Sequence, residues 1–344
     1  MQGGVEKTIA KAVKNPKVRS RIGLNQEIII DEISMIHPLV FEAANRISKQ
    51  ILQSELPFGG TRLVVVGDFF QLPPVDRFEK KIPWIFESDL WKSLNFGTVE
   101  LSDCMRSSEK YFVDILQKIR WGRCDETVCA FLDAKKSRLK SDFMGTILFA
   151  RKAEVESYNQ RKLDSLGGEL RKFPTEVITR KALPMPREKV IEQSPLPQIL
   201  FLKEGALVMI RKNDESGLYV NGSLGVVKKI STEIITLELL DGTRTNIEKD
   251  DFHILDGDGK TVATIRNFPL TLGWAITIHK AQGSSIDRLF VNLNNLWEYG
   301  QAYVALSRAK DPEYLFVGDW TLNSIKADSG VKEFYSQLNE FQLI

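Results

Sequence analysis

The chain has 344 residues, of which 43% are hydrophobic and 27% charged, and this composition excludes an intrinsically disordered protein. Its net charge of +2 excludes a polybasic tail protein and a strongly acidic one, although a local basic face can still bind nucleic acid. The length predicts two domains and room for a small insertion. Three cysteines are too few for a disulfide scaffold.

No apolar run approaches the ~20 residues that a membrane-spanning helix needs. The first residues lack the apolar stretch of a secretory signal. We therefore expect a protein that is not secreted and has no membrane partner. The nucleus or mitochondrion of a eukaryote and the cytoplasm of a bacterium remain open as its location.

Short apolar runs that end in acidic or small residues mark the first and last thirds of the chain. They occupy residues 28–30, 63–66, 147–150, 289–291 and 314–317. Runs without polar alternation are typical of strands buried on both faces of a parallel sheet. Helical spacing between them, as in the segment after Pro38, predicts an α/β fold with parallel sheets covered by helices.

The middle of the chain has a different pattern. Residues 169–204 carry many charges and five prolines, which predicts an irregular connection. Residues 205–268 contain hairpin-type dipeptides such as Asn221-Gly222 and Asp241-Gly242, and residues 235–239 alternate between apolar and polar. This region predicts a small all-β insertion within the α/β part.

Two adjacent carboxylates, Asp31 and Glu32, directly follow the apolar run at residues 28–30. In an open parallel sheet, ligands bind at the carboxyl ends of the strands. An aspartate there can hold Mg²⁺ on a nucleotide, and a neighbouring glutamate can orient or deprotonate an attacking water.

A second motif, GDFFQLPPV at residues 67–75, directly follows the run at residues 63–66. Gly67 permits a tight turn, and the two prolines stiffen the loop. Gln71 places an amide at the predicted sheet edge, where it could contact a γ-phosphate or position a water.

Two further motifs are LGWAITIHKAQGSS at residues 272–285 and QAYVALSRA at residues 301–309. Together with the first two, they resemble superfamily-one helicases, specifically the Pif-one family of 5′-to-3′ DNA helicases. The resemblance extends from about residue 3 to residue 320. It implies two RecA-like domains that close on ATP and Mg²⁺ and move along single-stranded DNA.

The resemblance also implies domain boundaries. Residues 1–105 would form an incomplete first RecA-like domain, and residues 106–168 and 269–325 the second. The irregular connection at 169–204 and an SH3-like insertion at 205–268 would interrupt the second domain, and residues 326–344 would be a C-terminal tail.

Site residues follow by their positions in the motifs. Asp31 and Glu32 would hold Mg²⁺, and Glu32 would activate water. The residues expected to contact ATP are Asp31, Gln71, Arg106, Gln282 and Arg308. The two arginines would reach the γ-phosphate from the second domain, where a guanidinium fork neutralises the charge built up in phosphoryl transfer. The residues expected to bind DNA are Thr277, His279, Lys280, Tyr219 and Asn221. Tyr219 or Trp274 would stack on bases.

The partners implied are single-stranded DNA and duplex junctions, bound by a monomer that serves genome maintenance. ATP binding in such enzymes needs a Gly-rich P-loop, and none precedes Asp31, which follows only 30 residues. Three explanations for the missing P-loop are open: the chain is a fragment, the gene model is truncated, or the protein is a degenerate paralogue. So are a catalytically silent DNA-binding or regulatory remnant, the helicase module of a rolling-circle transposon and a RecD-type exonuclease subunit.

Overall fold

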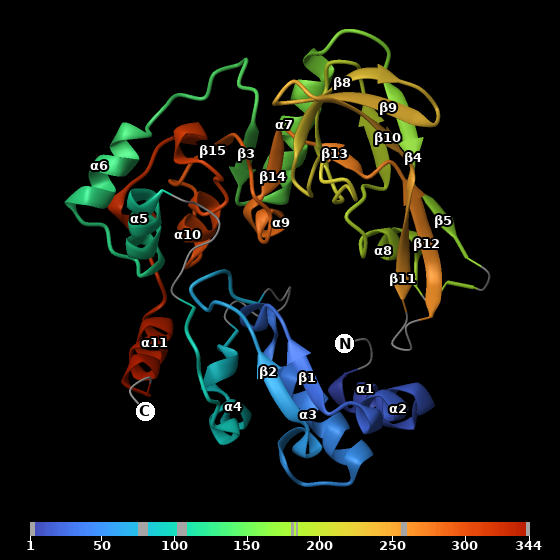
Figure 1. Cartoon of the computed structure of the whole chain (residues 1–344), viewed down its shortest axis with the longest axis vertical. Helices are drawn as coiled ribbons and strands as arrows, with labels where there is room; N and C mark the ends of the chain where they lie inside the picture. Colours follow the sequence, from blue (N-terminus) through green and yellow to red (C-terminus); the bar gives the residue numbers. More distant parts are fainter. Residues whose placement is uncertain are drawn as a thin grey trace.

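The structure is a computed structural model that describes residues 4–74, 82–101, 109–179, 182–183, 185–255 and 260–341. Figure 1 shows an N-terminal domain, a second domain around a parallel sheet and a β-rich module. Within the described ranges, no helix is both long and apolar enough to cross a bilayer.

Among its described residues, the N-terminal domain contains one parallel strand pair and four α-helices. Its elements are α1 (Val5–Lys14), α2 (Pro16–Leu24), β1 (Glu27–Ile30), α3 (Pro38–Leu52), β2 (Arg62–Val65) and α4 (Asp89–Leu94). Short 3₁₀ turns lie at Ile33–Met35, Pro57–Gly60 and Ile85–Glu87. The strands pair in register from Glu27 opposite Arg62 to Ile30 opposite Val65.

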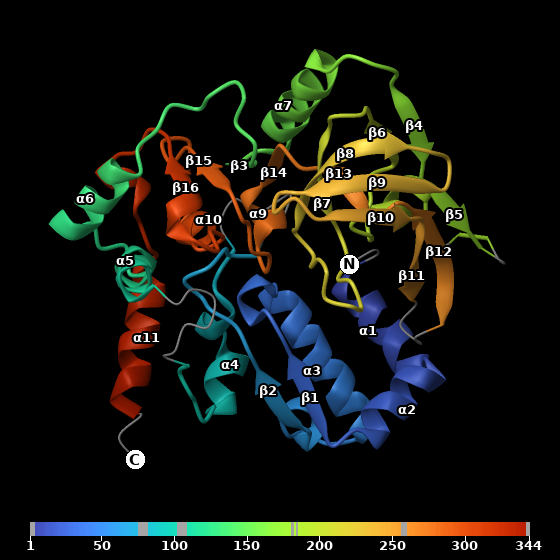
Figure 2. The ribbon, with the colours of Figure 1, turned by 45° about the horizontal axis from the view of Figure 1, so that its top comes forward.

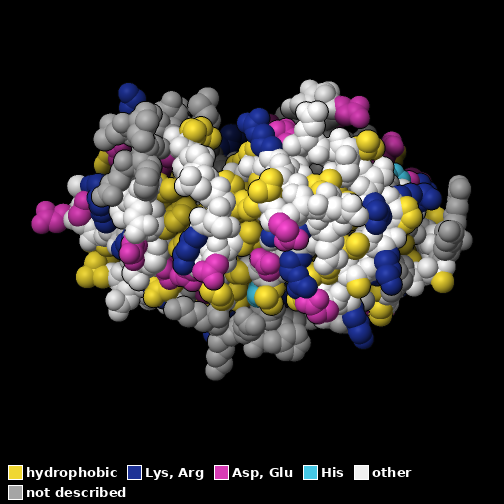
Figure 3. Space-filling view, turned by 90° about the horizontal axis from the view of Figure 1, so that it is seen from below, with side chains coloured by type: hydrophobic (Ala, Val, Ile, Leu, Met, Phe, Trp, Pro, Cys, Tyr) yellow, Lys and Arg dark blue, Asp and Glu magenta, His cyan; other side chains and the backbone are white. Residues whose placement is uncertain are grey.

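Aromatic side chains form most of the core of this domain. Phe41, Phe58 and Phe69 are each at most 5% exposed and belong to one hydrophobic cluster. Helix α1 packs on α3 by burying Ile9, and two hydrogen bonds of 2.7 and 2.8 Å join Arg46 to Glu6. Seen from below, hydrophobic side chains lie scattered among charged ones (Figure 3).

The second domain is built on a four-stranded parallel sheet in the order β14-β3-β15-β16. Its strands are β3 (Thr146–Phe149), β14 (Ala275–Thr277), β15 (Leu289–Val291) and β16 (Leu315–Val317). Its helices are α5 (Lys110–Arg120), α6 (Glu126–Ala134), α7 (Lys152–Ser165), α9 (Ile278–Ala281) and α10 (Gln301–Leu306), with 3₁₀ turns at Pro312–Tyr314 and Leu322–Ser324. Almost all of the strand residues are buried. The predicted α/β class with parallel sheets is therefore confirmed.

The β-rich module contains a five-stranded antiparallel sheet in the order β10-β9-β8-β7-β13. Its strands are β7 (Leu207–Ile210), β8 (Leu224–Ile230), β9 (Ile234–Leu239), β10 (Arg244–Glu248) and β13 (Leu270–Leu272). A second sheet joins β11 (Asp250–Leu255), β12 (Thr261–Asn267) and β5 (Glu176–Ile178). Figure 2 shows these strands together at one end of the molecule.

The prediction of an irregular connection at residues 169–204 is wrong. This segment contains β4 (Arg171–Pro174), β5, helix α8 (Arg187–Ile191) and β6 (Ile199–Leu202). Strand β4 pairs with β6, and β5 pairs with β12, where Val177 lies opposite Ile265. The β-rich region therefore begins at Arg171. Local composition hid this because the partner of β5 lies far along the chain.

The segment expected to be a C-terminal tail contains helix α11 (Ser329–Phe341). Val331 and Tyr335 are buried in the aromatic cluster of the N-terminal domain, and Phe334 and Leu338 pack against it. These four residues have the i, i+3, i+4, i+7 spacing of an amphipathic helix, so the sequence carried a signal for this element.

Candidate functional site

The turn after β1 presents two carboxylates. The Glu32 amide donates to Asp31 Oδ1 over 2.8 Å, and Glu32 has left-handed backbone angles (φ 51°, ψ 46°). The Ile33 amide donates to the Val66 carbonyl, and a Cβ on Gly67 would lie only 2.9 Å from the Ile33 nitrogen. A left-handed glutamate is uncommon and persists only where its surroundings hold it, which is frequent at functional sites.

Gln282 connects this turn to the second motif. Its Nε2 donates to Gln71 Oε1 over 3.1 Å and to Glu32 Oε2 over 3.3 Å. Gln282 follows α9 in the second domain, whereas Glu32 and Gln71 follow β1 and β2 in the first. The structure thus brings together three residues that the sequence predicted to contact ATP or its metal, and it brings them from two parallel sheets.

Two buried polar atoms at this junction have unused hydrogen-bonding capacity. Gln282 Oε1 and Ser34 Oγ find no partner among the described residues. A buried polar group without a partner costs about 1–3 kcal/mol, so a polar ligand at the junction could recover that cost. Gln282 Oε1, an acceptor, could therefore take a hydrogen bond from a ligand group that donates one.

Asp31 and Glu32 also suit Mg²⁺. The described part of the chain contains no group of three or more His, Cys, Asp or Glu side chains that could hold a metal. Mg²⁺ needs no such group, because proteins usually bind it through one or two carboxylates while water and substrate phosphates fill its other positions. Asp31 is exposed and Glu32 half-buried, so both remain accessible.

The structure describes only one of the two arginines that are expected to reach the γ-phosphate. Arg106 lies outside the described residues. Arg308 is 2% exposed, and its guanidinium donates to the Val304 carbonyl (2.9 Å), the Ser284 carbonyl (3.3 Å) and Ser307 Oγ (2.8 Å). These bonds hold Arg308 within the second domain and tie it to the segment that follows Gln282. A contact with phosphate remains a prediction for both residues.

The motif around α9 contains three of the expected DNA-binding residues. Thr277 is 9% exposed and caps α9, since its Oγ1 accepts a hydrogen bond from the Lys280 amide. His279 Nε2 lies 3.7 Å from Glu298 Oε2. Lys280 is exposed as a whole residue, but its ammonium group is partly desolvated. This desolvation, and then the nearby charges of Lys152 and Arg211, lower the pKa of Lys280. The carboxylates of Glu156 and Glu192 act in the opposite direction, so the Lys280 ammonium group lies among charges of both signs.

The expectation that Tyr219 or Trp274 stacks on DNA bases is wrong for this structure. Tyr219 is 7% and Trp274 4% exposed, and both belong to the main hydrophobic core. Neighbouring Asn221 is exposed, and its backbone amide donates a hydrogen bond to Asn213 Oδ1. The sequence did not single out Trp297, which is 45% exposed and has the Arg151 guanidinium 5.1 Å from its ring centre.

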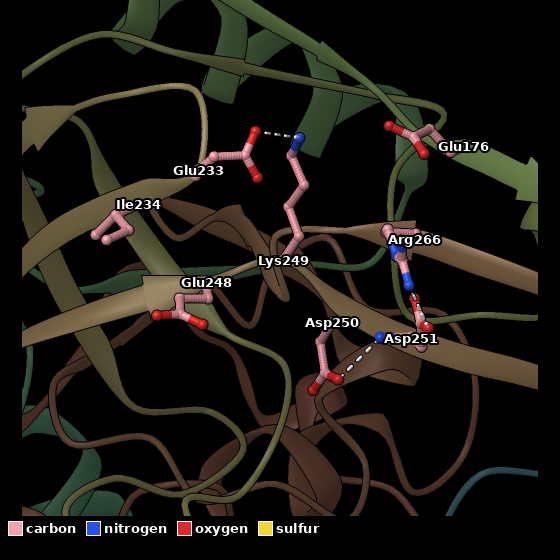
Figure 4. Close-up of a pocket in the computed structure, with 8 residues that line it drawn as sticks. All are labelled: Glu176, Glu233, Ile234, Glu248, Lys249, Asp250, Asp251 and Arg266. Carbon is pink, nitrogen blue, oxygen red and sulfur yellow. Dashed lines mark hydrogen bonds and ion pairs between the residues drawn. The ribbon is translucent and has the colours of Figure 1, made fainter.

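A cavity of about 540 Å³ lies between the two larger β-sheets of the module (Figure 4). It is lined by Glu176, Glu233, Ile234, Glu248, Lys249, Asp250, Asp251 and Arg266. Five carboxylates outnumber two cations there, and Arg266 is already paired with Asp251 at 2.6 Å. Like-charge repulsion makes this cavity unsuitable for a nucleotide or a DNA backbone.

Comparison with known proteins gives the family. The model of the PIF1-like helicase family matches residues 4–129. The chain is 38% identical over 341 residues to the ATP-dependent DNA helicase Pif1 of Bdellovibrio bacteriovorus, covering 98% of this chain and 76% of that protein. The chain belongs to the Pif1 helicase family.

Solved Pif1 structures share the fold. A Bacteroides Pif1 in complex with ADP-AlF4 superposes with a TM-score of 0.82 at 28% identity, over 96% of this chain and 79% of that one. The Bacteroides Pif1 complex with ADP-AlF3 and ssDNA gives a TM-score of 0.63 at 28% identity, over 95% and 79%. The RecA-like architecture expected from the motifs is thereby confirmed.

The chain spans about half the length of the vertebrate Pif1 relatives. It covers 52% of the Xenopus laevis ATP-dependent DNA helicase PIF1, with 36% identity over 95% of its own length. The activity of a whole Pif1 helicase is therefore a proposal for this chain.

Proposed function

We propose that this chain supplies the two-domain junction of an ATP-dependent DNA helicase that moves 5′ to 3′ along single-stranded DNA. The observation that carries the proposal is the hydrogen bonding of Gln282 to both Glu32 and Gln71, which joins the two parallel-sheet domains at one point. A nucleotide bound at this point would be sensed by both domains at once. Family membership supports the same activity.

In this proposal each residue at the junction has a separate task. Asp31 and Glu32 hold Mg²⁺, which neutralises the phosphate charge when it is bound. Glu32 accepts the proton of the attacking water, and Gln71 orients that water or the γ-phosphate. Gln282 passes the state of the site to α9, the short helix directly before it that contains Lys280.

Lys280 is proposed to bind the DNA backbone. We expect Lys280→Ala to weaken binding to single strands of any sequence and to lower the slope of log K against log salt by ~1, because one phosphate contact is lost. Fluorescence anisotropy at several salt concentrations measures both quantities. Lys92→Ala is the matched control, since Lys92 is an exposed lysine on α4 of the other domain. Equal affinities and slopes for the two variants would remove Lys280 from the DNA interface.

The direction of movement is tested with tailed duplexes. We expect the protein, with ATP and Mg²⁺, to separate a duplex that carries a 5′ single-stranded tail and to leave the same duplex with a 3′ tail intact. Strand separation is measured by the release of a fluorescent strand. Preferential unwinding of the 3′-tailed duplex would contradict the proposed polarity, and unwinding without ATP would contradict the proposed motor.

A further inference from the structure

The Asp68 side chain shapes the turn that carries Gln71. Its Oδ1 accepts a hydrogen bond from the backbone amide of Phe70 over 3.1 Å. Its backbone carbonyl accepts one from the backbone amide of Gln71 over 3.0 Å. A change in the position of the Asp68 carboxylate would therefore change the turn that leads directly into Gln71.

Two side chains from distant elements hold this carboxylate. Arg120, at the end of α5, donates through Nη2 to Oδ1 (3.0 Å) and through Nε to Oδ2 (3.2 Å). Tyr335 of α11 donates its hydroxyl to Oδ1 over 3.2 Å and accepts a hydrogen bond from the Phe69 amide over 3.2 Å. Arg120 is 9% and Tyr335 7% exposed, so solvent screens these bonds little.

The protonation states suit these roles. Burial lowers the pKa of Arg120, but the adjacent Asp68 carboxylate outweighs it, so the pKa is raised overall and the guanidinium stays charged. Burial, and then the charge of Asp68, raise the pKa of Tyr335, so its hydroxyl keeps the proton that it donates.

Aromatic packing fixes the next residue of the turn. The Phe70 ring stacks on Tyr335 with 4.7 Å between centroids and lies 4.8 Å from the Trp121 ring. The Arg120 guanidinium lies 4.5 Å from the centre of the same Phe70 ring. Residues at the end of α5 and in α11 therefore hold both the Asp68 carboxylate and the Phe70 ring of this turn.

Stability alone is a weak reason for this arrangement. A buried ion pair often contributes little net stability, because desolvation of the charges offsets their attraction. A bidentate guanidinium, by contrast, fixes the orientation of a carboxylate precisely enough to position a neighbouring group. The end of the turn, Gln71, is the residue that meets Gln282 from the second domain.

We propose that Arg120 and Tyr335 are positioning residues that act through Asp68 to set Gln71 in the nucleotide site. This inference rests on the proposed ATPase function. Because α5 belongs to the second domain, its shifts relative to the first domain would move Gln71 through the Arg120 contact.

Steady-state ATP hydrolysis by the protein with saturating single-stranded DNA tests the proposal. We expect Arg120→Lys to lower kcat by about tenfold or more while KM for ATP changes less than about twofold, since a small displacement of Gln71 affects the reacting geometry and not the binding. In a Gln71→Ala background, Arg120→Lys should have almost no further effect. Arg123→Lys is the matched control, because the exposed Arg123 lies beside Trp121 and contacts no carboxylate among the described residues.

Tyr335→Phe provides a second variant that keeps the stacked ring and loses only the hydroxyl. It should lower kcat in the same direction, and again only when Gln71 is present. Equal losses of kcat with and without Gln71, for either variant, would overturn the proposal and assign a purely structural role to these residues.

A second measurement separates this proposal from the proposed function. Cysteines placed at positions 71 and 282, with the three native cysteines changed to serine, can be joined by a short bis-maleimide without any hydrolysis. Arg120→Lys should reduce the cross-linking yield, and an unchanged yield would overturn the positioning role. A wild-type protein that hydrolyses no ATP would refute the proposed function, whatever the cross-linking result.

Discussion

Replacing Glu32 by glutamine is expected to lower DNA-stimulated ATP hydrolysis by about 10²–10⁴-fold, the usual contribution of a general base. Glutamine keeps the size of the side chain and can still meet Gln282, but it cannot accept a proton from water. Binding of ATP and of DNA should persist, because Asp31 still holds Mg²⁺ and no proposed DNA contact is changed. Phosphate release measured at saturating ATP and DNA gives the loss.

The matched control for this prediction is Glu27→Gln. Glu27 is an exposed glutamate at the opposite end of the same strand, β1, so its replacement should leave hydrolysis unchanged. A Glu32→Gln protein that retains hydrolysis within a few-fold of wild type would show that another group activates the water.

Replacing Gly300 by alanine is expected to lower the free energy of unfolding by about 2–4 kcal/mol, through backbone strain and steric overlap together. Gly300 has φ of 75°, and a Cβ there would lie 2.5 Å from the Phe70 carbonyl oxygen and 2.7 Å from that of Gln71. Hydrolysis should fall as well, because the turn that carries Gln71 would be pushed away from the start of α10.

Gly217→Ala separates the two causes. Gly217 has nearly the same φ, 78°, but a Cβ there would meet nothing within 4 Å. It should cost only the ~1–2 kcal/mol of left-handed backbone strain and leave hydrolysis intact. Urea unfolding of both variants gives the comparison, and equal losses of stability would show that the contact of Gly300 with Phe70 and Gln71 is unimportant.

The positions of Asp31 and Gln71 at the ends of neighbouring strands could be predicted from sequence because they depend on local order. Asp31 and Gln71 each follow an apolar run, and strands of that kind in a parallel sheet end at the same edge. The family resemblance placed Gln71 and Gln282 at the same expected ATP site, and the structure joins them by a hydrogen bond. Neighbours in the sequence were sufficient to place Asp31 and Gln71, whereas the expectation for Gln282 came from the resemblance.

Features that depend on distant contacts could not be predicted. Whether Tyr219 faces the core or the solvent depends on how the β-rich module packs on the parallel-sheet domain, and no local pattern reports that packing. The partner of β5 is β12, and the partners of Asp68 are Arg120 and Tyr335, all remote in sequence. Helix α11 was missed as well: residues 326–344 were expected to be a tail, although Val331, Phe334 and Tyr335 have the spacing of an amphipathic helix.

The most direct test is the initial rate of ATP hydrolysis by the purified protein with Mg²⁺, measured with and without single-stranded DNA. If Glu32, Gln71 and Gln282 form one nucleotide site between two motor domains, hydrolysis should occur, single strands should stimulate it, and removal of Mg²⁺ with EDTA should abolish it. Salt-dependent binding to single strands without any ATP turnover would contradict that conclusion.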